Sequence, residues 1–197
     1  GIDSSKPAGD SCEYFHDGYG SIYLVISDGM GTGRQASIES KMVINHFKRL
    51  IKAGVDYKLA IKMVNSIMIS KSNDENFATL DISKINLDDG RLKLIKYGAS
   101  STLIKHGDTL TMINSPSFPI GIVSDVEPFE KEIDFGEDDI LVMLSDGVEE
   151  SEYKNIKQVL LSQKRNNINS ITGEICKNAQ KSSSDDVTVM LAKIYKN

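Results

Sequence analysis

Two aspartate-glycine pairs follow the two most apolar runs of the sequence. The run IYLVI leads into SDGMGTG, which carries Asp28 and Gly29, and ILVML leads into SDGVEES, which carries Asp146 and Gly147. A strand end holds a side chain rigidly, and a following glycine lets the backbone turn away without a Cβ clash. The small glycine also leaves its carbonyl open as a ligand. Both pairs are therefore candidates for a site.

Two further aspartates complete a set of four. Asp10 in AGDS precedes the first strong strand, and Asp185 in SSDDVT stands where the last strand begins. If these strands are neighbours, four carboxylates converge, and like charges a few ångströms apart cost several kcal/mol at an effective dielectric near ~20. No Lys or Arg adjoins any of the four in sequence. Divalent cations are therefore the predicted counter-charge, and all-oxygen ligation suits Mg²⁺ or Mn²⁺.

Simpler interpretations exist for single members of this set. An Asp-Gly pair after a strand is most often just a turn, and only the joint occurrence of matched pairs favours a site. A nucleotide-binding loop is disfavoured, because Arg34 replaces the last glycine of a G-x-G-x-x-G fingerprint and Asp28 would repel a phosphate. The remaining turn acids are interpreted as solvated hairpin residues: Asp88, Asp89, Glu137, Asp138 and Asp139.

Histidine and cysteine offer no competing chemistry. His16, His46 and His106 show no metal-ligand spacing, and the last two are interpreted as surface or boundary residues. A place near the site is left open for His16, which follows Asp10 by six residues, and no role is assigned to it. Cys12 and Cys176 stand in no CxxC motif and are interpreted as free thiols. A Ser-His-Asp arrangement is not predicted, because the GxSxG motif is absent.

The composition restricts the fold and the partners. With 197 residues, 40% of them hydrophobic, residues 1–197 are predicted to form a single domain. The net charge of −5 and the lack of a Lys/Arg cluster argue against nucleic-acid binding. No apolar run reaches the roughly 18–20 residues of a transmembrane helix, so this segment is not expected in a membrane. The start so close to Asp10 favours the C-terminal domain of a larger protein.

Apolar periodicity predicts a strand followed by a helical hairpin. Residues 21–27 form a buried strand, and a helix is predicted over about 34–52, with Thr32 as N-cap and Gln35 as its capping-box partner. A second helix is predicted to begin after the N-cap Asp56. Its predicted buried residues are Leu59, Ala60, Met63, Val64 and Ile67.

Period-two patterns predict further strands. Hairpins turn at 88–90 and 106–108, and two more strands flank the acidic turn 136–139. A weakly patterned helical region at about 153–181 precedes a last strand at 187–194. Many antiparallel strands with helices in two separate blocks predict an α+β layered fold.

Five motifs together resemble one protein family. They are GDS at 9–11, ISDGMGTG at 26–33, AxxES at 36–40, LSDGVEES at 144–151 and DDVTVMLAKI at 185–194. In this order they are similar to the metal-dependent serine/threonine protein phosphatases of the PPM (type 2C) family. The similarity is greatest to its bacterial branch of stage II sporulation protein E and stress-response regulators. The resemblance implies a four-layer α-β-β-α sandwich of two packed, mainly antiparallel sheets with flanking helices and a two-metal site.

The resemblance also implies roles for the aspartates. Asp28 would bridge two Mn²⁺ or Mg²⁺ ions, and Asp10 and the carbonyl of Gly29 would serve one of them. Asp146 and Asp185 would serve the other. With Asp28 and Asp146 as the central catalytic residues, a metal-activated water would attack the phosphorus without a covalent phosphoenzyme.

Other positions depart from the family or stand beside its ligands. Asp186 matches a position next to a ligand and is the weaker candidate. The phosphate-binding arginine and the leaving-group histidine of some members have no match, so the leaving-group acid is open. Gly31 and Gly33, from their place between strand and helix, are predicted to form an adjustable, regulatory joint.

The implied biological role is in sporulation. The substrate would be a phosphoserine on an anti-sigma-factor antagonist protein, whose dephosphorylation activates a sporulation sigma factor. This segment is expected to be a cytoplasmic domain, with a membrane anchor elsewhere in the full-length protein. The alternative is a non-catalytic or regulator-dependent scaffold of the same fold that binds a signalling partner. A homodimer is left open.

Overall fold

The structure is a computed structural model that describes residues 8–31, 33–71, 77–162, 167–183 and 185–195. The chain forms two units. The first unit contains Asp3–Ala99 and Ser115–Asp134, and the second contains Ser100–Asn114 and Phe135–Asn197. The single domain predicted from the chain length stays a prediction.

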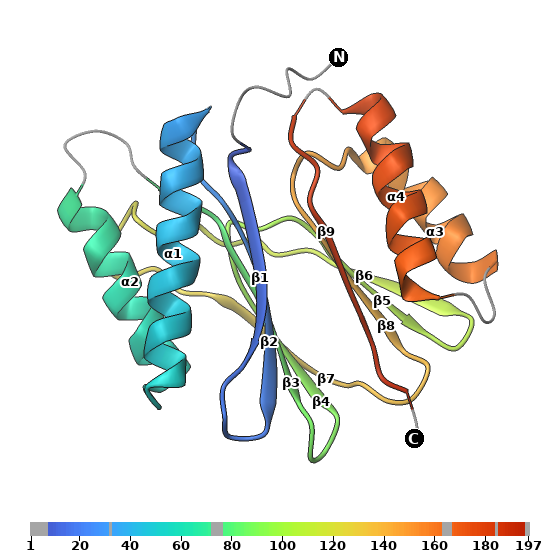
Figure 1. Cartoon of the computed structure of the whole chain (residues 1–197), viewed down its shortest axis with the longest axis horizontal. Helices are drawn as coiled ribbons and strands as arrows, with labels where there is room; N and C mark the ends of the chain where they lie inside the picture. Colours follow the sequence, from blue (N-terminus) through green and yellow to red (C-terminus); the bar gives the residue numbers. More distant parts are fainter. Residues whose placement is uncertain (1–7, 32, 72–76, 163–166, 184, 196–197) are drawn as a thin grey trace. The chain divides into compact units, whose positions relative to one another are not determined.

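The described part of the first unit consists of one antiparallel sheet and two helices (Figure 1). Its strands are β1 (Asp10–His16), β2 (Ser21–Asp28), β3 (Leu80–Asn86), β4 (Arg91–Tyr97) and β7 (Phe129–Asp134). They lie in the order β1-β2-β3-β4-β7. The helices α1 (Arg34–Lys52) and α2 (Tyr57–Lys71) pack on one face of this sheet. Both predicted helices and the predicted hairpin of β3 and β4 are confirmed.

The described part of the second unit has the same plan with fewer strands. Its strands are β5 (Thr102–His106), β6 (Thr109–Ile113), β8 (Ile140–Leu144) and β9 (Val189–Lys193). They lie in the antiparallel order β6-β5-β8-β9. A short 3-10 helix (Glu150–Glu152) leads into α3 (Tyr153–Ser162), and α4 (Ile168–Ser182) precedes β9. Two antiparallel sheets with helices in two blocks confirm the predicted α+β fold.

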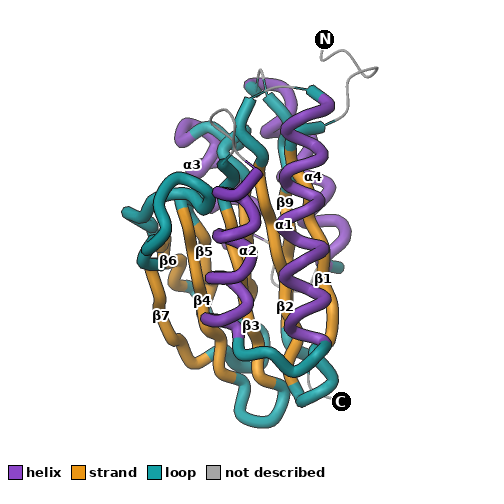
Figure 2. The backbone as a smooth tube through the Cα atoms, turned by 90° about the vertical axis from the view of Figure 1, so that its left-hand side faces the viewer, coloured by secondary structure: helices purple, strands orange, loops and turns teal. Residues whose placement is uncertain are grey.

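Aromatic packing holds α1 against β1 and β2. Phe15 and Tyr23 stack across the two strands with ring centroids 5.3 Å apart, and Phe47 of α1 packs edge-on against them, at 6.3 and 5.9 Å. Such aromatic pairs contribute about 0.5–1.5 kcal/mol each beyond area burial. Figure 2 shows α1 lying along these strands. The helix is therefore fixed on the strands that carry Asp10 and Asp28.

The core of the second unit lies between its sheet and its two helices. Val142 and Leu144 of β8 face a cluster of buried apolar side chains from α3 and α4. The helical members of this cluster are Ile156, Val159, Leu160, Ile171, Ile175 and Ala179. All five residues of β8 are buried, which confirms the strand predicted from the run ILVML. This packing fixes the strand that leads to Asp146.

The buried face of the second helix overlaps the predicted one only in part: Ala60 and Val64 are buried as predicted, and Ile67 is partly buried. Asp56 is its N-cap as predicted, because its Oδ1 accepts the N–H of Lys58 at 2.9 Å. The prediction that Leu59 and Met63 are buried is wrong, since they are 54% and 42% exposed. The buried residues are Ala60, Ile61, Val64, Asn65 and Met68. The helix is apolar on both sides, so its periodicity did not select the face that meets the sheet.

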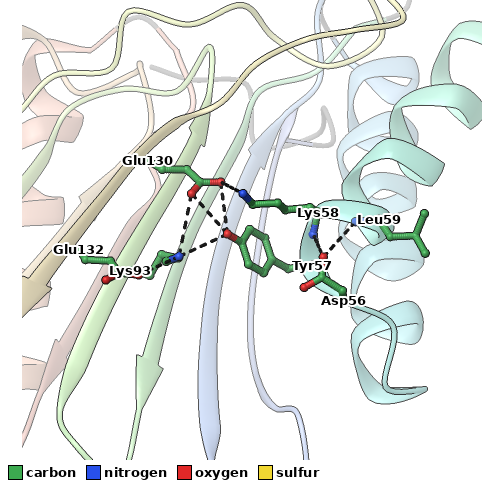
Figure 3. A network of polar contacts seen from close by, with 7 residues as sticks. All are labelled: Asp56, Tyr57, Lys58, Leu59, Lys93, Glu130 and Glu132. Carbon is green, nitrogen blue, oxygen red and sulfur yellow. Dashed lines mark hydrogen bonds and ion pairs between the residues drawn. The ribbon is translucent and has the colours of Figure 1, made fainter.

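A polar network ties the start of α2 to the edge of the first sheet (Figure 3). The Tyr57 hydroxyl lies 3.3 Å from both carboxylate oxygens of Glu130 on β7 and 3.4 Å from Lys93 Nζ on β4. Lys93 also pairs with Glu132 at 2.8 Å. The side chains of Lys93 and Glu130 are 26% and 27% exposed and that of Glu132 is 55% exposed. Ion pairs that water reaches contribute about 0–1 kcal/mol. The network supports α2 without adding much stability.

The acidic turn at 136–139 is not a hairpin turn. The two strands that flank it, β7 and β8, belong to different sheets. The prediction that Asp139 is solvated is wrong, because it is 1% exposed and accepts from Gly136 N–H at 2.8 Å. Its other oxygen lies 2.7 Å from Nδ1 of His106, an exposed residue as predicted. Because Asp139 stands beside other acidic residues in this turn, the sequence pattern did not distinguish its buried, hydrogen-bonded side chain from solvated ones.

Candidate functional site

Asp10 and Asp28 occupy facing positions in the first unit. Asp10 is the first residue of β1, Asp28 is the last residue of β2, and the antiparallel register pairs them directly. Residues paired in this way have Cβ atoms about 4.5–5.5 Å apart. Both side chains are half-buried. The register therefore brings two carboxylates to the same end of the sheet, and a shared cation would remove their repulsion.

Gly29 lies where two backbone segments meet. A Cβ atom here would lie 2.1 Å from the carbonyl oxygen of Ala36, in the first turn of α1. Its backbone also bridges to Ala78, and its N–H donates to the carbonyl oxygen of Gly9 at 3.5 Å. Any side chain at this position would push α1 away from the strand end. Close approach of the backbone, and not a positive φ, therefore requires glycine here.

Gly31 and Gly33 have a different role in the connection to α1. Their φ angles are 95° and 80°, and a Cβ atom at either would meet no atom within 4 Å. The prediction of Thr32 as N-cap is wrong, because the N-cap is Gly33, without a side-chain cap bond; Thr32 itself lies outside the described residues. Gln35 donates to Glu39 Oε1 at 2.6 Å instead of reaching back. Left-handed backbone, which glycine adopts easily, forms this connection.

The second Asp-Gly pair repeats the backbone contact in the second unit. Asp146 follows β8 by two residues, and a Cβ atom on Gly147 would lie 1.9 Å from the carbonyl oxygen of Asp186. The N–H of Asp186 donates to Oδ1 of Asp185 at 2.8 Å, and the N–H of Asp185 donates to Ser183 Oγ at 3.0 Å. The segment before β9 is thus folded against Gly147, with Asp185 close to Asp146.

The carboxylates of Asp146 and Asp185 repel each other. Desolvation raises the pKa of Asp146, the charge of Asp185 raises it further, and hydrogen bonds from the N–H groups of Asp146 and Gly147 lower it. Both side chains remain exposed enough for an ion in solution to reach them. A cation beside them would relieve the repulsion, so this pair of oxygen ligands fits a hard divalent ion.

Two serines that were not predicted as functional anchor the two strand ends. Ser27 is buried and donates to the carbonyl oxygen of Thr79 at 2.7 Å, while the N–H of Asp28 donates to Thr79 Oγ1 at 2.9 Å. Ser145, at the same place in the second motif, accepts from the N–H of Thr188 at 2.9 Å. The sequence signal for these serines is that the whole triplet Ser-Asp-Gly repeats, and not only Asp-Gly.

The nearby thiol and the histidines add no nucleophile. Desolvation and the charge of Asp10 raise the pKa of the Cys12 thiol, which keeps it protonated. His46 Nδ1 lies 2.9 Å from the carbonyl oxygen of Met42 within α1. His16 ends β1, about 20 Å along the strand from Asp10 at ~3.3 Å per residue. Carboxylate and carbonyl oxygens therefore remain as the candidate ligand atoms.

Comparison with known proteins identifies relatives across nearly the whole chain. The family model described as "Stage II sporulation protein E (SpoIIE)" matches residues 18–195. Stage II sporulation protein E of Priestia megaterium is 32% identical over 201 residues, covering 96% of this chain and 34% of that protein. The protein of the same name from Bacillus subtilis (strain 168) is 38% identical over 143 residues, covering 72% of this chain and 17% of that protein. The chain thus spans a minor part of these relatives.

Solved structures show the same arrangement of elements. One contains the PP2C phosphatase domain and a fragment of the regulatory domain of the cell fate determinant SpoIIE from Bacillus subtilis. It matches with a TM-score of 0.84 and 31% identity over 96% of this chain and 59% of that chain. RsbX in complex with magnesium matches with a TM-score of 0.76 and 20% identity, over 96% of this chain and 89% of that chain. At this lower identity the likeness is one of fold alone.

Proposed function

Because the chain belongs to the stage II sporulation protein E family and has the fold of its PP2C phosphatase domain, we propose that it is a metal-dependent protein-serine phosphatase. The observation that carries this proposal is the repeated strand end, an aspartate followed by a glycine packed against a backbone carbonyl. Each unit has one such end. Rigidly held carboxylates of this kind suit metal-assisted hydrolysis.

The proposed metal ligands come from the two strand ends and the segments beside them. They are Asp10, Asp28, the carbonyl oxygen of Gly29, Asp146 and Asp185. Asp28 and Asp10 would hold a cation together, and their direct pairing in the strand register supports this. The repulsion between Asp146 and Asp185 supports a cation beside that pair. Asp186 is not assigned, because its backbone supports Gly147.

The chain contributes position and charge to the proposed reaction. When bound, two Mn²⁺ or Mg²⁺ ions would supply activation of the attacking water and neutralisation of the phosphoryl charge. The hydrogen bonds of Ser27 and Ser145 hold the strand ends from which Asp28 and Asp146 project. The raised pKa of the Cys12 thiol disfavours it as a nucleophile, which agrees with hydrolysis that forms no covalent phosphoenzyme.

The proposed substrate is a phosphoserine of an anti-sigma-factor antagonist, so that hydrolysis activates a sporulation sigma factor. Family membership and the names of the curated relatives support a role in sporulation, and the substrate itself is proposed from the resemblance of the motifs. A cytoplasmic location, in a longer protein with a membrane anchor elsewhere, is part of the proposal and rests on the family resemblance alone; the chain spans 34% of one relative. Among the described residues, no helix is long and apolar enough to cross a bilayer.

Phosphate release from a phosphoserine protein tests the activity. The parent chain should release phosphate with Mn²⁺ and stop when a chelator is added. Asp146→Asn should remove most of the activity, whereas Asp108→Asn, which removes one charge from an exposed turn, should leave it intact. A parent chain that binds its partner and Mn²⁺ but releases no phosphate would instead support the non-catalytic scaffold.

The connection between β2 and α1 is the proposed regulatory joint. Gly31 and Gly33 have left-handed backbone with open space around them, and α1 rests on Gly29 through Ala36. A shift of α1 would therefore move the Gly29 carbonyl. Gly31→Ala adds strain at a positive φ, so it should change the Mn²⁺ concentration needed for half-maximal activity. An unchanged metal titration and an unchanged rate would remove this joint from the proposal.

A further inference from the structure

One buried hydroxyl connects α1 to the residues on both sides of Asp10. Ser40 is 0% exposed, and its Oγ donates to the carbonyl oxygen of Gly9 at 2.6 Å. The same Oγ lies 2.8 Å from Oγ of Ser11. A hydroxyl has one proton to give, so Ser40 donates to Gly9 and accepts from Ser11. Ser11, Ser40 and Gly9 thus form a short chain of hydrogen bonds around Asp10.

This use of a helical serine differs from that of other serines in the chain. Serines inside helices commonly donate to a carbonyl of the preceding turn, as Ser66 does to Lys62 at 2.9 Å and Ser70 to Ile67 at 2.9 Å. The corresponding distance from Ser40 to the carbonyl of Ser37 is 3.3 Å, longer than its bond to Gly9 across the helix-strand interface. Ser40 therefore directs its proton out of α1 and onto β1.

The position of β1 makes this contact consequential for Asp10. In the part of the chain that the structure describes, β1 is the edge strand of its sheet and pairs only with β2. At Asp10, the first residue of β1, the backbone pairs with β2 on one side. On the α1 side, the backbone is held by the hydrogen bond from Ser40 to the carbonyl of Gly9. The Gly9 carbonyl also accepts the N–H of Gly29 at 3.5 Å. One carbonyl thus links Asp10, Gly29 and α1.

We propose that Ser40 is a positioning residue that holds the Asp10 carboxylate for metal binding and transmits movements of α1 to it. This inference rests on the proposed function, in which Asp10 is a metal ligand. Groups that orient metal ligands change metal affinity by about 10–100-fold when they are removed. Ser40→Ala should therefore weaken Mn²⁺ binding within that range. Its kcat should largely recover at saturating Mn²⁺, because Ser40 contacts no reacting atom.

Two further variants, Ser11→Ala and Ser66→Ala, serve as a partial disruption and as a control. Ser11→Ala removes one member of the chain but leaves the Ser40 bond to Gly9, so its effect on the Mn²⁺ dissociation constant should be smaller than that of Ser40→Ala. Ser66→Ala removes a hydroxyl that, among the described residues, bonds only within α2. This substitution should leave the Mn²⁺ dissociation constant unchanged. Ser40→Cys, with a weak donor of similar size, should fall between the parent and Ser40→Ala.

Mn²⁺ binding to the 197-residue chain is measured by calorimetry or by electron paramagnetic resonance, with circular dichroism as the check on folding. If Ser40→Ala does not fold, Ser40→Cys and Ser11→Ala carry the test. The inference is overturned if folded Ser40 variants bind Mn²⁺ like the parent while Asp10→Asn binds it more weakly. If the parent and Asp10→Asn bind Mn²⁺ equally, the assignment of Asp10 itself is wrong, and with it the proposed site.

Discussion

The two Ser-Asp-Gly ends share a construction but differ in what they rest on. In both, a serine anchors the strand end to a neighbouring segment and a glycine lies against a backbone carbonyl. Gly29 meets Ala36, which belongs to a 19-residue helix, whereas Gly147 meets Asp186 in the segment before β9. The first end is therefore mechanically joined to α1, and the second to the loop that carries its own partner aspartate.

This difference supports the proposal that the first end is adjustable and the second is fixed. Between Gly29 and α1 the backbone passes through Gly31 and Gly33, which both have a positive φ and room for an added Cβ atom; the Gly33 carbonyl accepts the N–H of Ser37 at 3.2 Å. After Gly147, Val148 N–H donates to the carbonyl of Ser145 at 3.2 Å and closes a tight turn. We therefore propose that regulation acts on the first end. The same three-residue motif can serve as a rigid ligand or as a movable one, depending on the segment behind it.

The largest expected effect comes from removing either aspartate charge. Asp28→Asn and Asp146→Asn should each lower kcat by more than about 100-fold, since they remove proposed ligands and even supporting groups are worth 10–100-fold. Phosphate release at saturating Mn²⁺ measures the loss, with Asp108→Asn as the matched control. If only one of the two substitutions lowers the rate, the two ends do not serve one reaction.

The glycine contacts can be broken separately from the chemistry. Gly29→Ala and Gly147→Ala should each lower the free energy of unfolding by about 1–3 kcal/mol, because the new methyl group would overlap a backbone carbonyl. Gly173→Ala in α4 is the control, since its Cβ meets nothing within 4 Å; it should stabilise by about 0.5–1 kcal/mol. Urea titration measures all three. Equal stability of Gly29→Ala and Gly173→Ala would contradict the described contact.

The anchoring serines should give a smaller effect. Ser27→Ala removes one hydrogen bond at a strand end, and Ser145→Ala removes the bond from Thr188 N–H and a longer one to the carbonyl of Asp186; each hydrogen bond is worth about 0.5–1.5 kcal/mol. The free energy of unfolding measures this cost, and Ser66→Ala on α2 is the comparison. If the two serines matter no more than Ser66, the triplet repeat is a coincidence of sequence and only the Asp-Gly pairs are shared.

The smallest effect concerns the charge of Asp146 in metal-free protein. Its pKa is raised in the folded state, so the folded state binds the proton more tightly than the unfolded chain. Protonation of Asp146 therefore stabilises the folded protein. This contribution is fully present below the pKa that Asp146 has in the unfolded chain, and it is lost as the pH rises through the pKa that Asp146 has in the folded protein. At pH 7, Asp146→Asn should therefore raise the free energy of unfolding, by less than about 1 kcal/mol because solvent screens the charge.

Urea titrations in chelator at pH 7 and below about pH 3.9, the ordinary aspartate pKa, test this sign. The gain from Asp146→Asn should shrink toward zero at the lower pH, where the aspartate is protonated in both states. Asp108→Asn, in an exposed turn, is the control substitution. A gain that grows on acidification would mean that the Asp146 charge stabilises the folded protein.

Local patterns were sufficient to predict most elements of the fold. The run IYLVI predicts a strand, and β2 is buried along almost its whole length. The Asp89-Gly90 turn predicts the β3-β4 hairpin, because Gly90 takes the left-handed conformation that such turns need. Asp56 predicts the start of α2 for the equally local reason that its carboxylate accepts nearby N–H groups. These features depend on neighbours in sequence.

The errors fall where neighbours in space decide. Leu59 and Met63 are exposed because the sheet meets another face of α2, and Asp139 is buried because Gly136 and His106 bond to it. Gly33 replaces Thr32 as N-cap because glycine adopts the left-handed backbone that leads into α1. Periodicity and capping patterns describe one segment at a time. They do not specify which surface that segment will meet.

The candidate site shows the same division. The sequence by itself determined that Asp28 and Asp146 follow apolar strands and are followed by glycine. Strand burial and turn formation depend on residues that are adjacent in sequence. Only the tertiary structure decided that Asp10 faces Asp28, that Gly29 and Gly147 rest on carbonyls distant in sequence, and that Ser40 reaches β1. Those contacts join segments that meet only when the helices pack on the sheets, so no local pattern records them.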